Sequence, residues 1–206
     1  MAPLPMFPLG SVLLPGAILP LHVFEPRYRA LVQDCLAGAR EFGVVLIERG
    51  SEVGGGDVRS DVGALARIVQ AQELDDGRWA VLAVGLKRLR VREWLEDDPY
   101  PRADVEEWPE GDEVPPPAAA GLAPVVTRLR RVLALATEAG DVTFPATLDL
   151  SDDAVLAGYQ ACAAAPLGPH DQRRLLAAGS PASRLALLDA LLVEAEEVLA
   201  FRLAGG

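Results

Sequence analysis

Lysine, histidine and cysteine are almost missing from this sequence of 206 residues. It holds one lysine, Lys87, two histidines, His22 and His170, and two cysteines, Cys35 and Cys162. A phosphate-binding loop of the form GxxxxGK followed by Ser or Thr requires a lysine after a glycine-rich turn, and the residues around Lys87 do not fit that pattern. The cysteines share no metal-ligand spacing with either histidine, so neither a disulfide framework nor a zinc site is predicted.

The same scarcity argues against most nucleophilic catalysis. A Ser-His-Asp centre would have to recruit one of two isolated histidines, and a GxSxG turn is absent from the sequence. A serine–lysine pair would depend on Lys87, which lies in a predicted strand. A pair of carboxylates acting as acid and base stays open, because nothing singles out two of the 30 acidic residues. We therefore expect a non-enzymatic chain with no catalytic residue, no metal and no cofactor, and we interpret His22 as an interior side chain.

Long uncharged runs are missing too. The first twenty residues are apolar, but they lack a basic segment and five prolines interrupt them, which argues against both a signal peptide and a membrane helix. Every other uncharged stretch falls short of the ~18 residues that a membrane span needs. We expect a cytoplasmic protein without a membrane partner. The net charge of -11 and the pI near 4.6 disfavour non-specific binding of nucleic acid, since they would repel a phosphate backbone.

Apolar residues are abundant, making up half of the sequence against 24% charged residues. That balance predicts a folded chain, and a chain of this length can bury roughly 70% of its unfolded surface. In the first half, Asp75-Asp76-Gly77 predicts a tight hairpin because these residues tolerate positive φ. After an extended, sharply bent segment over 4–23, we expect strands at Phe42–Glu48, Val62–Glu73, Arg78–Val84, Leu86–Trp94 and Arg102–Glu107.

One helix interrupts these strands. Pro26 suits the first position of a helix, and apolar residues recur at helical spacing from Tyr28 to Ala39. The helix face that carries Cys35 should be buried. Because the alternating β-α-β rhythm of a parallel sheet is absent, we predict an α+β fold in which an antiparallel sheet curls into a small barrel with this one embedded helix.

The second half is predicted to be helical. Alanine and leucine dominate residues 118–139, Ser151-Asp152-Asp153 caps a further helical run, residues 169–178 form a short helix, and Ser180 caps a long one. The long helix should pack along a leucine seam and expose its acidic face. Residues 109–117 are acidic and proline-rich, as in stiff linkers. We predict a barrel over 1–108, a linker over 109–117 and a helical bundle over 118–206, with the glycines at 54–56 as a flexible loop.

A basic strand offers an alternative function. Arg88, Arg90 and Arg92 alternate with apolar residues and follow Lys87, and such a row could bind RNA, with Trp79 or Trp94 stacking on a base. The simpler interpretation is a solvated outer face. We favour it because the acidic residues that follow the strand would dilute the positive potential.

A long ordered stretch of the sequence resembles a known family. The resemblance rests on Pro15–Arg29 (PGAILPLHVFEPRYR), Met6–Leu9 (MFPL), Val62–Ile68 (VGALARI), Gly85–Val91 (GLKRLRV), Pro166–Leu167, Gln172–Leu176 and Arg184–Leu199. In order and spacing, these segments are similar to the N-terminal domain of Lon proteases, over nearly the whole chain. The resemblance implies a PUA-like β-barrel followed by a helical bundle. The ATPase and serine–lysine centre of the full protease have no counterpart here.

The resemblance also implies a function: recognition of unfolded or damaged polypeptides. We expect the partners to be such polypeptides, or a separate protease or chaperone, while a homo-oligomer stays open. An apolar groove near the junction of barrel and helix would suit peptide capture. The candidate peptide-binding residues are Phe24, Tyr28, Trp94 and Tyr100 as apolar contacts and Arg27, Arg29 and Arg88 as polar contacts. Core packing is the simpler fate of Tyr28, and Glu25 with Arg27 could form a structural ion pair.

Three functions therefore compete at this point. The leading one is a non-catalytic adaptor or substrate-recognition module in protein quality control. The alternative is a PUA-like RNA-binding protein that uses Arg88, Arg90 and Arg92, and the third is a small-molecule barrel or an undetected hydrolase. A continuous positive stripe on the surface would favour RNA, whereas an exposed apolar patch would favour polypeptides.

Overall fold

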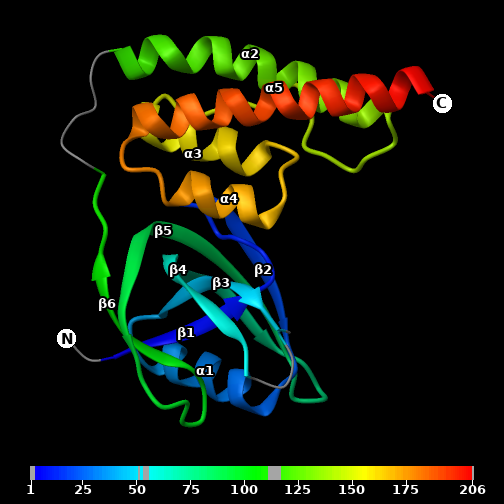
Figure 1. Cartoon of the computed structure of the whole chain (residues 1–206). Coiled ribbons are helices and arrows are strands. Elements are labelled where there is room, and N and C mark those ends of the chain that lie inside the picture. The colour runs from blue at the N-terminus through cyan, green and yellow to red at the C-terminus, as the bar shows by residue number, and fades with distance from the viewer. Residues whose placement is uncertain (1–2, 51, 53–55, 111–116, 206) are drawn as a thin grey trace. The chain divides into compact units, whose positions relative to one another are not determined.

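The computed structural model describes residues 3–50, 52, 56–110 and 117–205. The chain divides into two compact units, Met1–Pro109 and Glu110–Gly206, and each is considered by itself (Figure 1). The first unit holds the strands and one helix, and the second holds the remaining helices. Of the expected linker over 109–117, residues 111–116 lie outside the described residues, as do residues 54 and 55 of the expected glycine loop.

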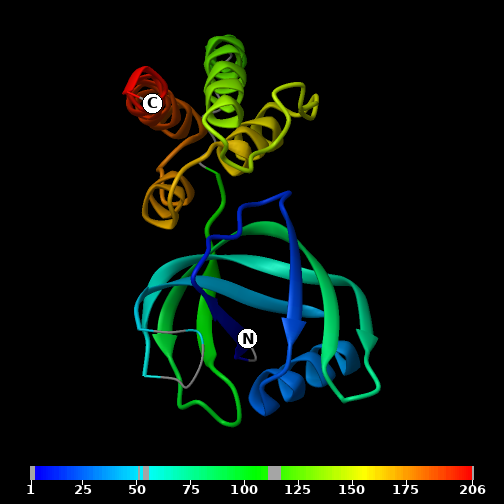
Figure 2. The same cartoon turned by 90° about the vertical axis from the view of Figure 1, so that its right-hand side faces the viewer.

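The first unit is a curled mixed sheet. Its elements are β1 (Leu4–Leu9), β2 (Ile18–Val23), α1 (Pro26–Ala37), β3 (Glu41–Arg49), β4 (Val58–Glu73), β5 (Trp79–Trp94) and β6 (Arg102–Glu107). The strand order is β2-β5-β4-β3-β1-β6, and an additional pairing of β5 with β6 makes the sheet curl back on itself (Figure 2). The α+β class and the embedded helix are thus confirmed.

Two features of the sheet differ from the expectation. β1 pairs with β3 in parallel, so the sheet is mixed and not a clean antiparallel barrel. The segments expected as two strands, Arg78–Val84 and Leu86–Trp94, form one continuous strand, β5. The register against β4 shifts at Leu86, and such a bulge bends a strand without ending it. β5 can therefore pair with β2 along its first half and with β6 along its second.

Helix α1 covers one face of this sheet. Pro26 stands in its first turn, and its buried side chains include Leu31 and Cys35. Tyr28 stacks on Phe7 of β1 with ring centroids 4.1 Å apart. Successive residues of a strand point to opposite faces, so the sheet carries a second apolar cluster on its other face, which packs Met6, Val45, Leu89 and Ala103.

The second unit packs four helices among the residues that the structure describes. They are α2 (Pro117–Glu138), α3 (Ala154–Ala164), α4 (Pro169–Leu176) and α5 (Pro181–Gly205). Asp153 caps α3 by accepting a hydrogen bond from the Leu156 backbone N–H at 2.8 Å, and the Ser180 hydroxyl accepts one from the Ser183 N–H at 3.2 Å. None of the described helices combines the length and apolar composition that a membrane span requires.

The polar side of α5 is less solvated than expected. Asp189 accepts a hydrogen bond from Arg128 of α2 at 2.8 Å, and Glu196 lies 2.9 Å from Arg131 and 3.4 Å from Arg128. The opposite side carries the predicted leucine seam, with Leu188 and Leu192 in the core. The acidic residues of α5 therefore link two helices electrostatically, which the sequence of α5 alone does not reveal.

Candidate functional site

The predicted peptide-binding residues do not gather into one patch. Tyr28 and Tyr100 lie in the core beside α1. The Tyr100 hydroxyl donates to the carboxylate of Asp34 at 2.6 Å. Burial raises the pKa of both phenols to about 12, which keeps them protonated at neutral pH. These two rings hold α1 on the sheet and offer no surface to a ligand.

Arg27 takes part in a local ion pair. Its Nε donates to the carboxylate of Glu25 at 3.1 Å, the alternative that the sequence left open. Its guanidinium also lies 4.5 Å from the centre of the Tyr28 ring. The charge of Arg27 is thus already matched at the start of α1, so this residue fixes the entry of the helix.

Trp94 belongs to a second ionic cluster. The Arg59 guanidinium lies 4.8 Å from the Trp94 ring centre and donates to Asp57 and Asp97, each at 2.8 Å. Although partial burial opposes ionisation of Asp57, hydrogen bonds and the positive charge of Arg59 hold the pKa of this carboxyl below its usual range. The cluster ties the start of β4 to the segment after β5, which is a structural task.

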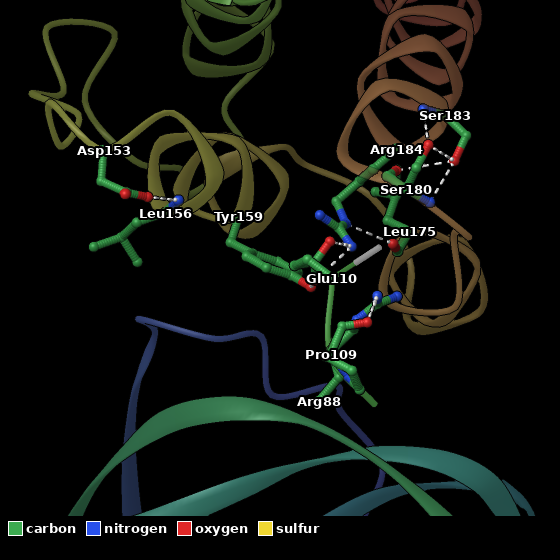
Figure 3. A network of polar contacts seen from close by, with 10 residues as sticks. All are labelled: Arg88, Pro109, Glu110, Asp153, Leu156, Tyr159, Leu175, Ser180, Ser183 and Arg184. Carbon is green, nitrogen blue, oxygen red and sulfur yellow. Dashed lines mark hydrogen bonds and ion pairs between the residues drawn. The ribbon is translucent and has the colours of Figure 1, made fainter. Parts of the chain in front are cut away.

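Arg29 and Arg88 lie apart from these clusters. The Arg29 guanidinium fills the space beside Gly77 in the β4–β5 turn, where φ is +77° and an added Cβ would lie 2.8 Å from Nη2. Arg88 is only 2% exposed. Its guanidinium stacks 4.4 Å from the centre of the Trp108 ring and donates to the carbonyl of Pro109 at 3.3 Å (Figure 3). Arg88 therefore anchors the end of the first unit, contrary to its expected place on a solvated basic face.

The other basic residues of β5 are matched by β6. Arg92 donates to Glu106 at 2.6 Å, Lys87 pairs with Glu107, and Arg90 lies 4.0 Å from the ring centre of Trp108. The antiparallel register places Glu106 opposite Arg90 and Glu107 opposite Leu89, so Arg92 and Lys87 reach these carboxylates diagonally across the strand pair. In the described part of the chain the basic strand is thus no continuous positive stripe, and the RNA alternative loses its main support.

Phe24 is exposed, and it continues a row of outward-facing residues. Along β2 the exposed positions are Ile18, Pro20 and His22, every second residue, and Phe24 follows at the same spacing. Period-two alternation places these side chains on one face. The exposure of His22 corrects its expected interior position. Ile18 is 68% exposed, which is far more than a core-facing isoleucine shows.

The row on β2 joins apolar residues of the two neighbouring strands. Ile18 pairs with Val84 and Pro20 pairs with Leu82 across to β5. On β4, Val69 sits in the register shift between Ile68 and Gln70, and the exposed polar residues Arg67 and Gln70, which pair with Val84 and Leu82, border the apolar residues. Val69 is 52% exposed. We call these five residues, Ile18, Pro20, Val69, Leu82 and Val84, the outer apolar face. Within the described residues β2 is the edge of the sheet, and Pro20, which has no N–H, suits such a position.

Sequence reasoning missed most of this face. β2 reads Ile-Leu-Pro-Leu-His-Val, so His22 is the one polar residue on its outward face and no regular polar alternation marks that face. Val69 was assigned to a strand, but the shift that turns it outward depends on pairing with β5. A search for edge strands with unbroken apolar character would have been the available signal, with Pro20 as the mark of an edge.

The second unit contains a buried polar network (Figure 3). Arg184 of α5 is 1% exposed, and its Nε donates to the carbonyl of Leu175 at 3.1 Å. Its Nη2 reaches both carboxylate oxygens of Glu110, at 2.9 and 3.1 Å. The guanidinium also lies 3.9 Å from the ring centre of Tyr159, whose hydroxyl donates to Glu110. Every group here is paired with another, as a buried charge requires.

A curled mixed sheet with one embedded helix, followed by a helical unit, defines the class of protein. The family model described as the ATP-dependent protease La (LON) substrate-binding domain matches residues 3–194. The chain belongs to this family. Because that model describes a substrate-binding domain, membership places the chain with modules of substrate recognition.

Solved structures agree with this assignment. A Lon N-terminal domain protein from Xanthomonas campestris is 32% identical, with a TM-score of 0.68 over 92% of this chain and 98% of that one. The N-terminal domain of a Mycobacterium avium complex Lon protease has a TM-score of 0.66 over 93% of this chain and 98% of that one, and at 20% identity it shows the fold alone.

The curated relatives are longer proteins. Lon protease 2 of Herpetosiphon aurantiacus is 28% identical over 199 residues, which is 95% of this chain and 24% of that protein. Lon protease of Anaeromyxobacter dehalogenans is 34% identical over 108 residues, which is 51% of this chain and 13% of that protein. The chain therefore corresponds to a small part of these relatives.

Proposed function

We propose that this chain is a non-catalytic recognition module that captures unfolded or damaged polypeptides in cytoplasmic protein quality control. Its membership in a substrate-binding family supports recognition as the task. Capture of unfolded chains is a more specific proposal than recognition, and the outer apolar face is the observation that supports it. Folded proteins hide their apolar side chains, so an exposed apolar surface distinguishes unfolded from folded clients.

The shape of this face suits an extended polypeptide. Ile18, Val84 and their neighbours lie on three adjacent strands, and an extended chain can lie along such a sheet face. Side chains of an extended client could pack there in many registers. The affinity would therefore depend on the apolar content of the client more than on its exact sequence. Phe24 lies at one end of the β2 row and extends the apolar surface. Of the seven predicted residues, Phe24 is the one that we keep in the proposed contact.

The test is suppression of client aggregation without ATP. The full chain should slow light scattering by a chemically denatured client, and Ile18→Asp and Val69→Asp should each reduce the effect at least about threefold, because a carboxylate opposes burial of apolar surface. Val58→Asp is the matched control. Val58 is also a valine of β4 and is 43% exposed, but it pairs with Arg49 at the far end of the strand.

Equal loss in the Val69 and Val58 variants, or no suppression by the unchanged chain with several clients, would remove the proposal. Circular dichroism of each variant separates lost binding from lost folding. We further propose that captured clients pass to a separate ATP-dependent protease or chaperone, a step motivated by the similarity of the chain to proteins named as Lon proteases. That step is tested by adding such a protease and asking whether the unchanged chain, but not Ile18→Asp, accelerates client degradation.

A further inference from the structure

Strand β2 has one row of backbone groups that faces no neighbouring strand. β2 is the last strand in the order β2-β5-β4-β3-β1-β6, and among the described residues it pairs only with β5. Successive residues of a strand present their N–H and C=O groups to opposite sides. Every second residue of β2 therefore presents its backbone away from β5, toward the edge of the sheet.

The register shows which residues these are. Gly85 of β5 donates to the Ala17 carbonyl at 2.9 Å, so the backbone of Ala17 points to β5. Ile18 comes next and points away from β5, as do Pro20 and His22 at the same spacing. Pro20 has no N–H, and in this position its absence costs the pairing of β2 with β5 no hydrogen bond.

The outward groups have no partner in the described part of the chain. Apart from the pairing with β5, no backbone hydrogen bond to another described segment involves Ile18, Pro20 or His22. The edge thus offers the N–H groups of Ile18 and His22 as donors and the carbonyls of all three residues as acceptors. Such a row of donors and acceptors is a template for one more strand.

The side chains along this edge determine which segments suit it. Ile18 and Pro20 belong to the outer apolar face, and the exposed ring of Phe24 follows in the same row. In an added strand, alternate side chains lie beside them on that face, at the close spacing of neighbouring strands. A segment with apolar residues at every second position would therefore bury apolar surface there.

Pro20 distinguishes a client from a second copy of this chain. Two β2 edges related by a twofold axis pair in the antiparallel sense, with Ile18 opposite His22 and Pro20 opposite Pro20. The central pair, which should exchange two hydrogen bonds, then makes none because neither proline has an N–H. A proline-free segment opposite Pro20 loses only one of these bonds. The edge therefore suits a foreign extended segment better than another β2.

We propose that β2 binds an extended, proline-free segment of a client as an additional strand of the sheet. This inference rests on the proposed function, because the added strand is part of the captured client. Main-chain hydrogen bonds supply affinity that does not depend on the client sequence, and the outer apolar face favours apolar side chains. Unfolded chains offer unpaired N–H and C=O groups, whereas folded chains have already paired most of theirs.

The test uses the full chain and a fluorescein-labelled peptide of about nine residues in which valine alternates with threonine between terminal lysines. Each central residue is N-methylated in turn, and binding is measured by fluorescence anisotropy. Methylation should weaken binding at least about fivefold at every second position and much less at the positions between, because only alternate N–H groups of the peptide face β2.

A pair of substitutions at His22 tests the same hydrogen bonds from the side of the protein. His22→Pro and His22→Ala lose the same side chain, but only the proline also removes the outward N–H. His22→Pro should bind the unmethylated peptide at least about fivefold more weakly than His22→Ala. Circular dichroism checks that both variants fold.

Pro20→Val gives the opposite change. It supplies the missing N–H and keeps an apolar side chain, so it should strengthen peptide binding about threefold relative to the unchanged chain. This variant decides the question if His22→Pro does not fold.

Three results would overturn the proposal. They are equal binding of all methylated peptides, equal binding by the two His22 variants, and no binding of the peptide at all. A dimer of the unchanged chain that the peptide dissociates would also overturn it, since the edge would then belong to a second copy.

Failure of this inference and failure of client capture are distinguishable. If Ile18→Asp reduces suppression of aggregation but methylation shows no alternation, clients pack on the outer apolar face without adding a strand, and only the strand proposal is lost. If methylation alternates but the chain suppresses no aggregation, β2 binds extended segments and only the capture proposal is lost.

Discussion

Single buried residues keep protons that the unfolded chain would release. Burial raises the pKa of the thiols of Cys35 and Cys162 to about 12, as it does for the phenols of Tyr28 and Tyr100. In the unfolded chain a thiol titrates near pH 8.5 and a phenol near pH 10. The contribution of these four groups to stability is therefore fully present below the unfolded pKa values and is lost as the pH rises from there toward about 12.

We predict that stability falls as the pH rises above about 9. There the unfolded state has lost protons that the native state still binds, so the free energy of unfolding decreases with pH. Urea unfolding at a series of pH values measures this. The Tyr100→Phe variant, which removes one such group, should show a shallower decline. A midpoint that stays constant or rises up to pH ~11 would contradict the assigned burial.

Glu110 is a second residue whose loss should lower the stability of the protein. It neutralises Arg184, which is buried, and a buried charge that loses a charged hydrogen-bond partner is costly. Glu110→Gln should lower the free energy of unfolding of the helical unit by about 2 kcal/mol. The control is Asp189→Asn in the half-exposed pair with Arg128, where the change should be much smaller. Comparable effects in urea unfolding would argue against the buried network.

Single elements were predictable where the signal is local. The hairpin at Gly77, where φ is +77°, and the helix that begins at Pro26 both follow from a few adjacent residues. The continuity of β5 through Leu86 and the parallel pairing of β1 with β3 do not. They depend on strands far apart in the sequence, and the Gly85-Leu86 step resembles a break unless the partner strands are known.

The candidate site was less predictable for the same reason. In the sequence, Arg88 is one member of a basic row. The ring that stacks on its guanidinium belongs to Trp108, twenty residues further along the chain, and the sequence does not indicate this contact. Ile18 shares its face of β2 with only one polar residue, His22, which is too weak a signal to show which face is outward. Phe24 was predicted as an apolar contact near the junction of barrel and helix, and its exposed side chain leaves that role as a prediction.

At the start of α3, the cap gives a local test of the helical unit. Asp153 accepts the hydrogen bond of the Leu156 N–H, one of the donors that a helix start leaves unpaired. Asp153→Ala should cost about 1 kcal/mol of stability. Asp152→Ala removes the same charge one residue earlier, on an exposed side chain, and should change the unfolding midpoint little. Equal shifts in the two variants would show that charge, and not the cap, is responsible.

At the scale of the whole molecule, the boundary between the two units determines which fragment of the helical half should be the more stable. The sequence places the start of the helical bundle at residue 118, whereas the compact unit begins at Glu110. We predict that a fragment over 110–206 is more stable than one over 118–206, because the shorter fragment leaves Arg184 without Glu110. Thermal unfolding of both fragments measures the difference. Equal melting temperatures would show that Glu110 contributes nothing to the bundle.

The ion pair between Lys87 and Glu107 has a practical consequence for studying this protein. Lys87 is the sole lysine in the sequence, so a dye or cross-linker that reacts with side-chain amines attaches at one defined point of β5. That point borders a small cavity beside Leu65 and Val105, and it is not one of the five residues of the outer apolar face. A fluorophore can thus be attached to a single side-chain amine without mutagenesis, and the outer apolar face is not chemically altered.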